Sequence, residues 1–126
     1  MVERPLYTVF IRRGPGNYTK QRLVAFLRSW YADTWRAFAA DFHVGALLSF
    51  NDLLRSEGFV PRLRAGNRGI AVIRAWTGVV SRHYYRLAHD AIRAADPDAL
   101  ILGDRLPIFY DSVAAMAPWV DVILFR

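Results

Sequence analysis

Apolar residues at helical spacing dominate the chain, and their longest run lies between about Ile70 and Ala95. In that run the apolar side chains follow one another in steps of three and four: Ile73, Trp76, Val80, Tyr84, Leu87 and Ala91. This period predicts one long amphipathic helix that buries this face and ends before Pro97. The opposite side carries Arg82, Arg86, His89 and Arg93. Such a basic stripe can bind phosphates, but it is more often a solvated outer helix face.

Shorter helices are expected before this one. Residues 12–17 form a turn cluster, because Gly and Pro interrupt regular structure, and Asn17 can cap the helix that follows. The inward face of that helix is predicted to consist of Leu23, Phe26, Leu27 and Trp30. Its other positions are Lys20, Gln21, Arg22, Arg28 and Ser29.

Two further short helices follow in the prediction. Asp33 is a candidate cap for a helix that carries Trp35, Phe38 and Phe42. Ser49, with Asp52 three residues later, resembles an acidic capping box before Leu53 and Leu54. Residues 58–69 then contain Pro61, Gly66 and several arginines, which predicts an irregular connection over the surface.

The last quarter of the chain has a different pattern. Two short apolar runs, at about 99–103 and 120–125, are bounded by turn residues, and a segment suited to a short helix, 111–116, lies between them. Strands joined by a helix pair in parallel through a right-handed crossover. The predicted fold class is therefore α/β: mostly helical, with two adjacent parallel strands at about 99–103 and 120–125.

Length and composition narrow the possibilities. At 126 residues the chain is at most one domain, 1–126, and about half of the ~250 residues of a (β/α)8 barrel. The hydrophobic fraction of 54% is high for a small domain, so we expect some apolar faces to remain uncovered. No apolar run is long enough to span a bilayer, and the first residues lack the apolar region of a signal peptide. We expect no membrane partner, and the compartment stays open.

Charge and chemistry exclude several classes of function. The net charge is +6, but the arginines are scattered and Lys20 is the one lysine, so a nucleic-acid partner is not expected. Without cysteine there is no thiolate nucleophile and no cysteine-based zinc site. The histidines, His43, His83 and His89, lack the spacing of a metal site. Serine-nucleophile and phosphate-loop motifs are absent, and neither a metal nor a cofactor is expected.

Two groups of motifs resemble a known family. Residues 20–33 have a Lys-Gln opening and a Phe-Leu-x-x-x-Tyr helix, and 49–54 read Ser-Phe-Asn-Asp-Leu-Leu. Both resemble the helical insertion after the fourth strand of agarase-like and β-galactosidase-like glycoside hydrolases of the (β/α)8 class. Residues 84–93, then Asp96-Pro97, 100–105 and 120–122 are similar to the helix, fifth strand and sixth strand of the same family. Together these motifs cover roughly 18–55 and 76–125.

The resemblance implies a partial (β/α)8 (TIM) barrel, from after strand four to strand six, with a helical insertion at 18–55 and a helix-strand-helix-strand segment at 70–126. It also implies a retaining β-glycosidase acting on β-linked galactosides or related polysaccharides, which needs two carboxyls ~5 Å apart. In the family these are glutamates, the first preceded by asparagine. The glutamates here, Glu3 and Glu57, do not follow asparagine. We therefore assign no catalytic residue and expect no activity from this chain alone.

Substrate contacts are expected after the predicted strand at 99–103, because a barrel presents such groups at the carboxyl ends of its strands. The candidate substrate-binding residues are Asp104, Arg105, Phe109 and Tyr110. Asp104 and Arg105 suit sugar hydroxyls, although a loop salt bridge is an equal interpretation. Trp30, Trp35, Trp76 and Trp119 can also stack on sugars, but core positions are favoured for Trp30 and Trp76. The expected partner is a carbohydrate, if the barrel is completed.

Two alternatives remain. One is a non-catalytic basic module that binds a polyanion or a protein partner through its arginines and aromatic residues. The other is a piece that does not fold stably alone, because two strands leave sheet edges exposed and so favour self-association.

Overall fold

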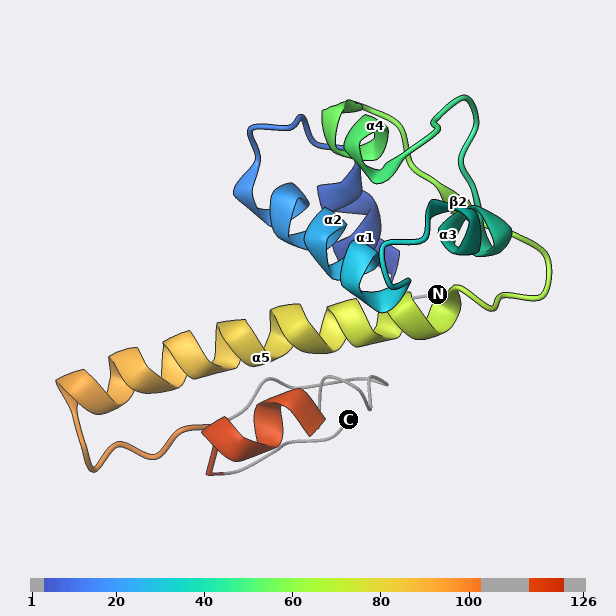
Figure 1. Ribbon diagram of the computed structural model, residues 1–126. Coiled ribbons are helices and arrows are strands. Elements are labelled where there is room, and N and C mark those ends of the chain that lie inside the picture. Colours follow the sequence, from blue (N-terminus) through green and yellow to red (C-terminus); the bar gives the residue numbers. More distant parts are fainter. Residues whose placement is uncertain (1–3, 103–113, 122–126) are drawn as a thin grey trace. The chain divides into compact units, whose positions relative to one another are not determined.

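The computed structural model describes residues 4–102 and 114–121, and these are mostly helical (Figure 1). The elements are α1 (Arg4–Ile11), α2 (Tyr18–Trp30), α3 (Trp35–Asp41), β1 (Phe42–His43), α4 (Phe50–Arg55), β2 (Arg62–Leu63), α5 (Ile70–Ala95) and the 3-10 turn η1 (Ala117–Trp119). They form two compact units whose boundary falls after Trp76, inside α5. The first unit contains α1 to α4, both strands and the start of α5.

Helix α1 was not among the predicted elements. Pro5 stands in its first turn, where a missing backbone N–H costs nothing. Tyr7 and Ile11, four residues apart, place their side chains on one face, and both are buried. Helix α1 packs against α2, and the Tyr7 ring centroid lies 5.8 Å from that of Phe42. The element was missed because eight residues contain too few turns to establish a helical period.

Helix α2 begins at the predicted cap but buries a different face. The Asn17 side chain accepts a hydrogen bond from the Lys20 amide at 2.9 Å, which confirms the cap. Leu23 and Leu27 are buried as expected. The expectation for the ends of this face was wrong: the Lys20 side chain is fully buried, while Trp30 is 49% exposed.

Of the next two helices, only α4 begins with the side-chain cap that the sequence predicted. Helix α3 follows Thr34, because Asp33 adopts a left-handed conformation and pairs with Arg28 at 2.9 Å. The prediction of Asp33 as the cap was therefore wrong. The Ser49 cap of α4 is confirmed, since its hydroxyl accepts from the Asp52 amide at 3.1 Å.

Aromatic rings make up the centre of the first unit. Phe38, which is fully buried, stacks on Phe42 with ring centroids 4.7 Å apart. Its ring also contacts three others: Tyr31, Trp35 and Phe50. Tyr31 directly follows α2, and the other rings come from α3, β1 and α4, so one cluster connects four short elements that could not be stable separately.

The segment at 58–69 was predicted to be irregular and superficial, and this is wrong in two respects. It contains β2, which pairs with β1 in antiparallel register, Phe42 opposite Leu63. Pro61 is also fully buried. The connection ends at Gly69, where a Cβ atom would lie 2.6 Å from the Phe42 ring, so that only glycine fits.

Helix α5 has the predicted bounds but not the predicted face. Trp76 is buried as expected, whereas Tyr84 and Leu87 are more than half exposed and Tyr85 is buried instead. Consecutive residues point about 100° apart around a helix. In the second unit the buried face is thus rotated by one residue from the predicted one.

The end of the second unit partly tests the predicted strands. The Asp121 amide donates to the Ile101 carbonyl at 2.8 Å, so the starts of the two predicted runs lie side by side. Of the predicted strands, the described parts, 99–102 and 120–121, form no strand element, and the parallel pair is not confirmed. Residue 103 and residues 122–125 lie outside the described residues. The described sheet, β1–β2, is antiparallel and lies elsewhere. Residues 114–116 are helical, in agreement with the helix expected at 111–116.

Candidate functional site

The predicted sugar contacts lie outside the described residues. These are Asp104, Arg105, Phe109 and Tyr110, and Glu3 is also outside. Their assignment therefore stays a prediction. The groups that can be assessed belong to five places: Glu57, the end of α3, a cavity beside α1, the contacts around Arg93, and the His89–Trp119 pair.

Glu57 follows α4 and has a cation as its neighbour. Its carboxylate lies against Gly14, and it favours the charged form of Lys20. The Lys20 ammonium donates to the Ser56 carbonyl and is 3.4 Å from the Ser56 hydroxyl. Burial lowers the pKa of Lys20, and the Glu57 carboxylate opposes this shift. Glu57 thus balances a buried charge in the first unit.

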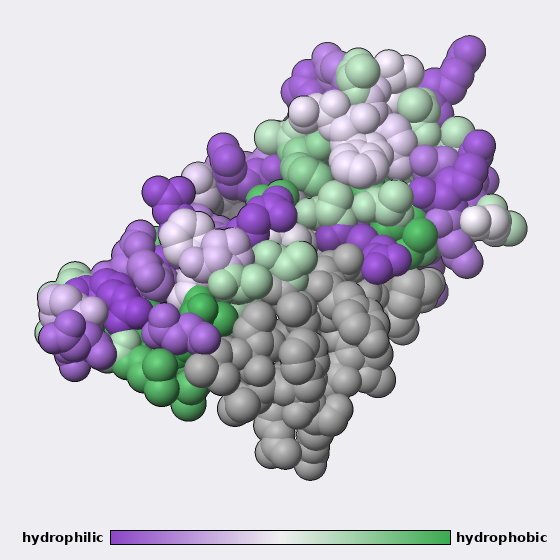
Figure 2. All heavy atoms as spheres, turned by 90° about the horizontal axis from the view of Figure 1, so that it is seen from below, coloured by the Kyte–Doolittle hydropathy of each residue, from purple (hydrophilic) through white to green (hydrophobic). Residues whose placement is uncertain are grey.

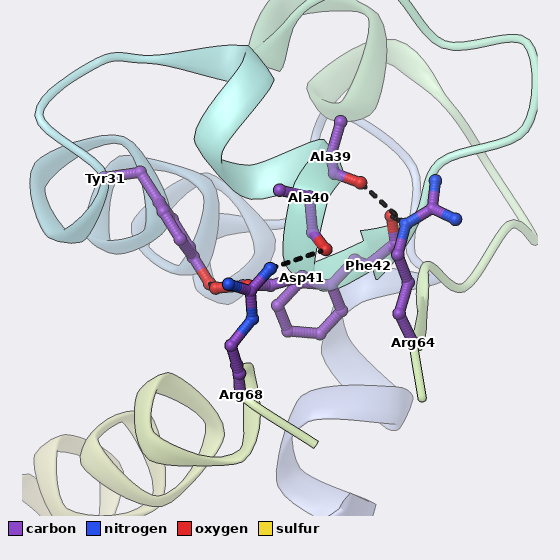
Figure 3. Close-up of polar contacts among 7 residues, drawn as sticks. All are labelled: Tyr31, Ala39, Ala40, Asp41, Phe42, Arg64 and Arg68. Carbon is purple, nitrogen blue, oxygen red and sulfur yellow. Dashed lines mark hydrogen bonds and ion pairs between the residues drawn. The ribbon is translucent and has the colours of Figure 1, made fainter. Parts of the chain in front are cut away.

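Two arginines donate hydrogen bonds to carbonyl groups at the carboxyl end of α3 (Figure 3). Arg64 Nε donates to the carbonyls of Ala39 at 2.8 Å and Phe42 at 3.2 Å. Arg68 Nη2 donates to the Ala40 carbonyl at 3.4 Å. Guanidinium groups are favourable there because the last carbonyls of a helix lack partners and carry its negative pole. These arginines therefore have a structural role.

At the same end of α3, the two carboxylate oxygens of Asp41 contact two different side chains. The Tyr31 hydroxyl donates to Asp41 Oδ2 at 2.9 Å, and Arg68 Nε is 3.3 Å from Oδ1. Burial raises the pKa of Tyr31, and the Asp41 carboxylate raises it further. The phenol therefore stays protonated and acts as a donor. With both oxygens engaged, Asp41 positions neighbouring groups (Figure 3).

A cavity of about 710 Å³ lies among the described residues of the first unit. Its wall consists of Tyr7, Thr8 and Arg12 of α1, residues 58–63, Asn67 and Ile73. The Tyr7 hydroxyl donates to the Pro61 carbonyl at 2.8 Å, and the Gly58 amide donates to the Arg12 carbonyl at 2.7 Å. Burial raises the pKa of Tyr7, so this phenol stays neutral.

In the second unit, Arg93 connects the end of α5 to two residues that follow it, Ala99 and Asp121. Its guanidinium donates to the Ala99 carbonyl and pairs with Asp121 at 3.0 Å. The Asp121 carboxylate also accepts from the Ile101 amide at 2.8 Å. This backbone hydrogen bond, followed by Arg93, lowers the pKa of Asp121. The expectation that Arg93 belongs to a solvated outer face is wrong, because its guanidinium group is hydrogen-bonded to residues that follow α5.

His89 and Trp119 lie together near a smaller cavity of about 180 Å³. Their ring centroids are 5.6 Å apart, and His89 Nδ1 is 3.1 Å from Asp90. Trp119 Nε1 is buried without a hydrogen-bond partner. Within the described part of the chain, no three metal-ligating side chains converge, and no helix is both long and apolar enough to cross a membrane.

The cavity beside α1 was missed at the level of sequence. Its signal was the short apolar run Phe59-Val60-Pro61 inside a glycine-rich and arginine-rich segment. Such a run in an otherwise polar connection indicates a packed loop, because a loop fully exposed to solvent gains nothing from three apolar side chains.

No protein-family model matches the chain, and no curated protein matches it by sequence. Solved structures do match it. With the crystal structure of an agarase, AgWH50C, the TM-score is 0.77 at 21% identity, over 94% of this chain and 17% of that one. With PfGH50B it is 0.75 at 19% identity, over 93% and 17%. With an exo-β-agarase it is 0.73 at 20% identity, over 97% and 16%. The chain thus spans less than a fifth of these proteins, and the resemblance to agarase-like glycoside hydrolases is confirmed at the level of the fold.

Proposed function

We propose that this chain is part of the catalytic barrel of a glycoside hydrolase that acts on β-linked galactosides of the agar type. The observation that carries the proposal is the fold similarity to an agarase over 94% of the chain at a TM-score of 0.77. The order of the sequence motifs, from the Lys20-Gln21 opening to the Gly103-Asp104-Arg105 sequence, supports it independently.

The proposal includes that this chain alone does not cleave its substrate. A retaining mechanism needs an acid and a nucleophile, both carboxyls, ~5 Å apart. Glu57 has Lys20 as its charged neighbour, and neither glutamate follows an asparagine. Asp104, Arg105, Phe109 and Tyr110 then contribute sugar contacts at the carboxyl end of the fifth strand of a (β/α)8 barrel.

Incubation of the purified chain with agaro-oligosaccharides and aryl β-galactosides tests the catalytic part. We expect no release of reducing ends or of the aryl group. Measurable turnover that scales with protein concentration and is lost in Glu57→Gln or Glu3→Gln would refute the claim that the catalytic pair is missing.

The binding part is tested with the same oligosaccharides by nuclear magnetic resonance titration. We expect shifts in the signals of residues 104–110, and at least about tenfold weaker binding in Arg105→Ala, because a charged hydrogen bond in a binding site contributes about 1.5–3 kcal/mol. Arg22→Ala, an exposed arginine of α2, is the matched control. If saccharide binding were equal in both variants, Arg105 would not be a substrate contact.

The alternative, a basic module for a polyanion or a protein partner, rests on exposed arginines of α5. Arg82 and Arg86 are exposed, but Arg86 is 3.9 Å from Asp90, and Arg93 is occupied by Ala99 and Asp121. Salt-sensitive retention on heparin that disappears in the triple variant Arg82→Ala, Arg86→Ala, Arg93→Ala would favour this alternative.

A further inference from the structure

The cavity beside α1 has the size of a small-molecule site. Its volume of about 710 Å³ falls within the ~300–1,000 Å³ of ligand pockets in proteins. The partly exposed Phe59, Val60 and Leu63 supply apolar wall, while Thr8 and Asn67 supply neutral hydrogen-bonding groups. This combination suits a ring-sized molecule that has both apolar faces and hydroxyl groups.

The charges around the cavity are of one sign. Arg12 and Arg62 both line it, and the described lining contains no carboxylate. Among the described residues, neither Arg12 nor Arg62 lies within ion-pair distance of a carboxylate, whereas Arg28, Arg68, Arg86 and Arg93 each pair with an aspartate. Two guanidinium groups with free donors at one hollow favour an anion, and guanidinium matches the planar or tetrahedral oxygens of carboxylate and sulfate.

The two walls that carry these arginines are fixed to each other. Arg12 belongs to the chain just after α1, and Arg62 belongs to β2. The Gly58 amide donates to the Arg12 carbonyl, and the Tyr7 hydroxyl donates to the Pro61 carbonyl, next to Arg62. β2 is itself held by its pairing with β1. Because the backbone on both sides is held in this way, little ordering is required when a ligand enters, which lowers the cost of binding.

We propose that this cavity binds a small organic anion, namely a monosaccharide-sized ring with one sulfate or carboxylate group. Arg12 and Arg62 bind the anionic group, and Phe59 and Leu63 contact the ring. The proposal does not depend on the proposed function, because none of these residues belongs to the predicted sugar contacts at 104–110.

Calorimetric titration of the full chain tests the proposal with four probes: galactose 6-sulfate, galacturonate, neutral galactose and sodium sulfate. We expect one or both anionic sugars to bind, and galactose and sodium sulfate to bind at least about tenfold more weakly, because each lacks one half of the recognised chemistry. A preference between the sulfate and the carboxylate sugar identifies the anionic group.

Variants locate the site. Arg12→Ala and Arg62→Ala should each weaken binding at least about tenfold, whereas Arg22→Ala, which removes the same charge from an exposed position of α2, should not. Both lining arginines are exposed, so far-ultraviolet circular dichroism should show unchanged folding. The proposal is overturned if neither anionic sugar binds the folded chain, if neutral galactose or sodium sulfate binds equally well, or if Arg22→Ala weakens binding as much as the lining variants.

Discussion

Each of the two compact units is stabilised internally by a different kind of interaction. In the first, the ring of Phe38 contacts four other rings and is fully buried. The second buries smaller apolar side chains, Ile101, Ala115 and Met116, and the chain after α5 is also held by hydrogen bonds and an ion pair that involve Arg93 and Asp121. Leu100, close to these contacts in sequence, is 69% exposed. Figure 2 shows hydrophobic residues that reach the surface on the face in view.

The aromatic core of the first unit should contribute more to the free energy of folding than the polar contacts that follow α5. Burial of an aromatic side chain contributes several kcal/mol, while an exposed ion pair contributes between zero and about 1 kcal/mol. We therefore expect the first unit to resist unfolding, and the segments that follow α5 to open at a lower free energy. Four changes test or refine this comparison.

The largest effect is expected for Phe38→Ala. Removing a fully buried ring leaves a cavity among Tyr31, Trp35, Phe42 and Phe50 and should lower the free energy of unfolding by about 3–5 kcal/mol. Urea unfolding followed by tryptophan fluorescence measures it. Trp30→Ala, which removes a half-exposed ring, serves as the control and should cost much less. Equal losses would mean that the aromatic cluster does not dominate the first unit.

Tyr7→Phe comes next, because it removes only the hydrogen bond to the Pro61 carbonyl. At neutral pH we expect a loss of about 1 kcal/mol. The folded pKa of Tyr7 is raised above its ordinary value of 10.0 by burial, so its contribution is complete below pH 10 and is lost as pH rises through the folded pKa. The difference between wild type and variant should thus shrink above pH 10.

Denaturant unfolding between pH 7 and pH 11 measures this difference. Tyr18→Phe, at a largely exposed position of α2, is the matched control and should leave the unfolding free energy unchanged at neutral pH. A constant difference between wild type and Tyr7→Phe across this range would contradict the assignment of Tyr7 as a buried neutral phenol.

A smaller, local effect is expected for Asp121→Asn. The Ile101 amide and Arg93 lose a charged acceptor, so the Ile101 amide should exchange with solvent faster while the first unit is unaffected. The pKa of Asp121 is lowered, so its contribution is present above the ordinary value of 3.8 and is lost as pH falls through the folded pKa. Hydrogen exchange measures this, with Asp98→Asn as control. If the Ile101 amide exchanged at the same rate in both variants, Asp121 would not be the acceptor that protects it.

The smallest effect is expected for Leu87→Gln combined with Leu100→Gln. Both side chains are more than half exposed, so the free energy of unfolding should change by no more than about 0.5 kcal/mol. Light scattering should show less self-association if apolar side chains of the second unit drive it. A loss of several kcal/mol would mean that Leu87 belongs to the core, as the sequence pattern predicted.

Local signals in the sequence predicted several elements correctly. The caps at Asn17 and Ser49 act as expected, because a side-chain oxygen reaches an amide three residues later without any tertiary contact. The bounds of α5 were also predictable, since helical spacing continues from Ile70 to Ala95 and Pro97 prevents its extension.

Which face of a helix is buried was less predictable. In α5 the adjacent pair Tyr84 and Tyr85 fits two apolar stripes one residue apart, and the contacts of the second unit select Tyr85. In α2, Lys20 is a charged residue and was expected on the outer face. It is buried because its ammonium group meets the carbonyl and the hydroxyl of Ser56. Ser56 is 36 residues from Lys20, so the helical period of α2 gives no indication that Lys20 is buried.

The sequence by itself determined where the long helix begins and ends, how two short helices are capped, and which family the ordered motifs resemble. Tertiary structure alone decided the pairing of β1 with β2, the burial of Lys20 and the cavity between Arg12 and Arg62. The physical reason is the range of the interactions: caps and helical periods act over three or four residues, whereas the contact of Tyr7 with Pro61 joins residues 54 positions apart. Such contacts depend on how all the elements pack together.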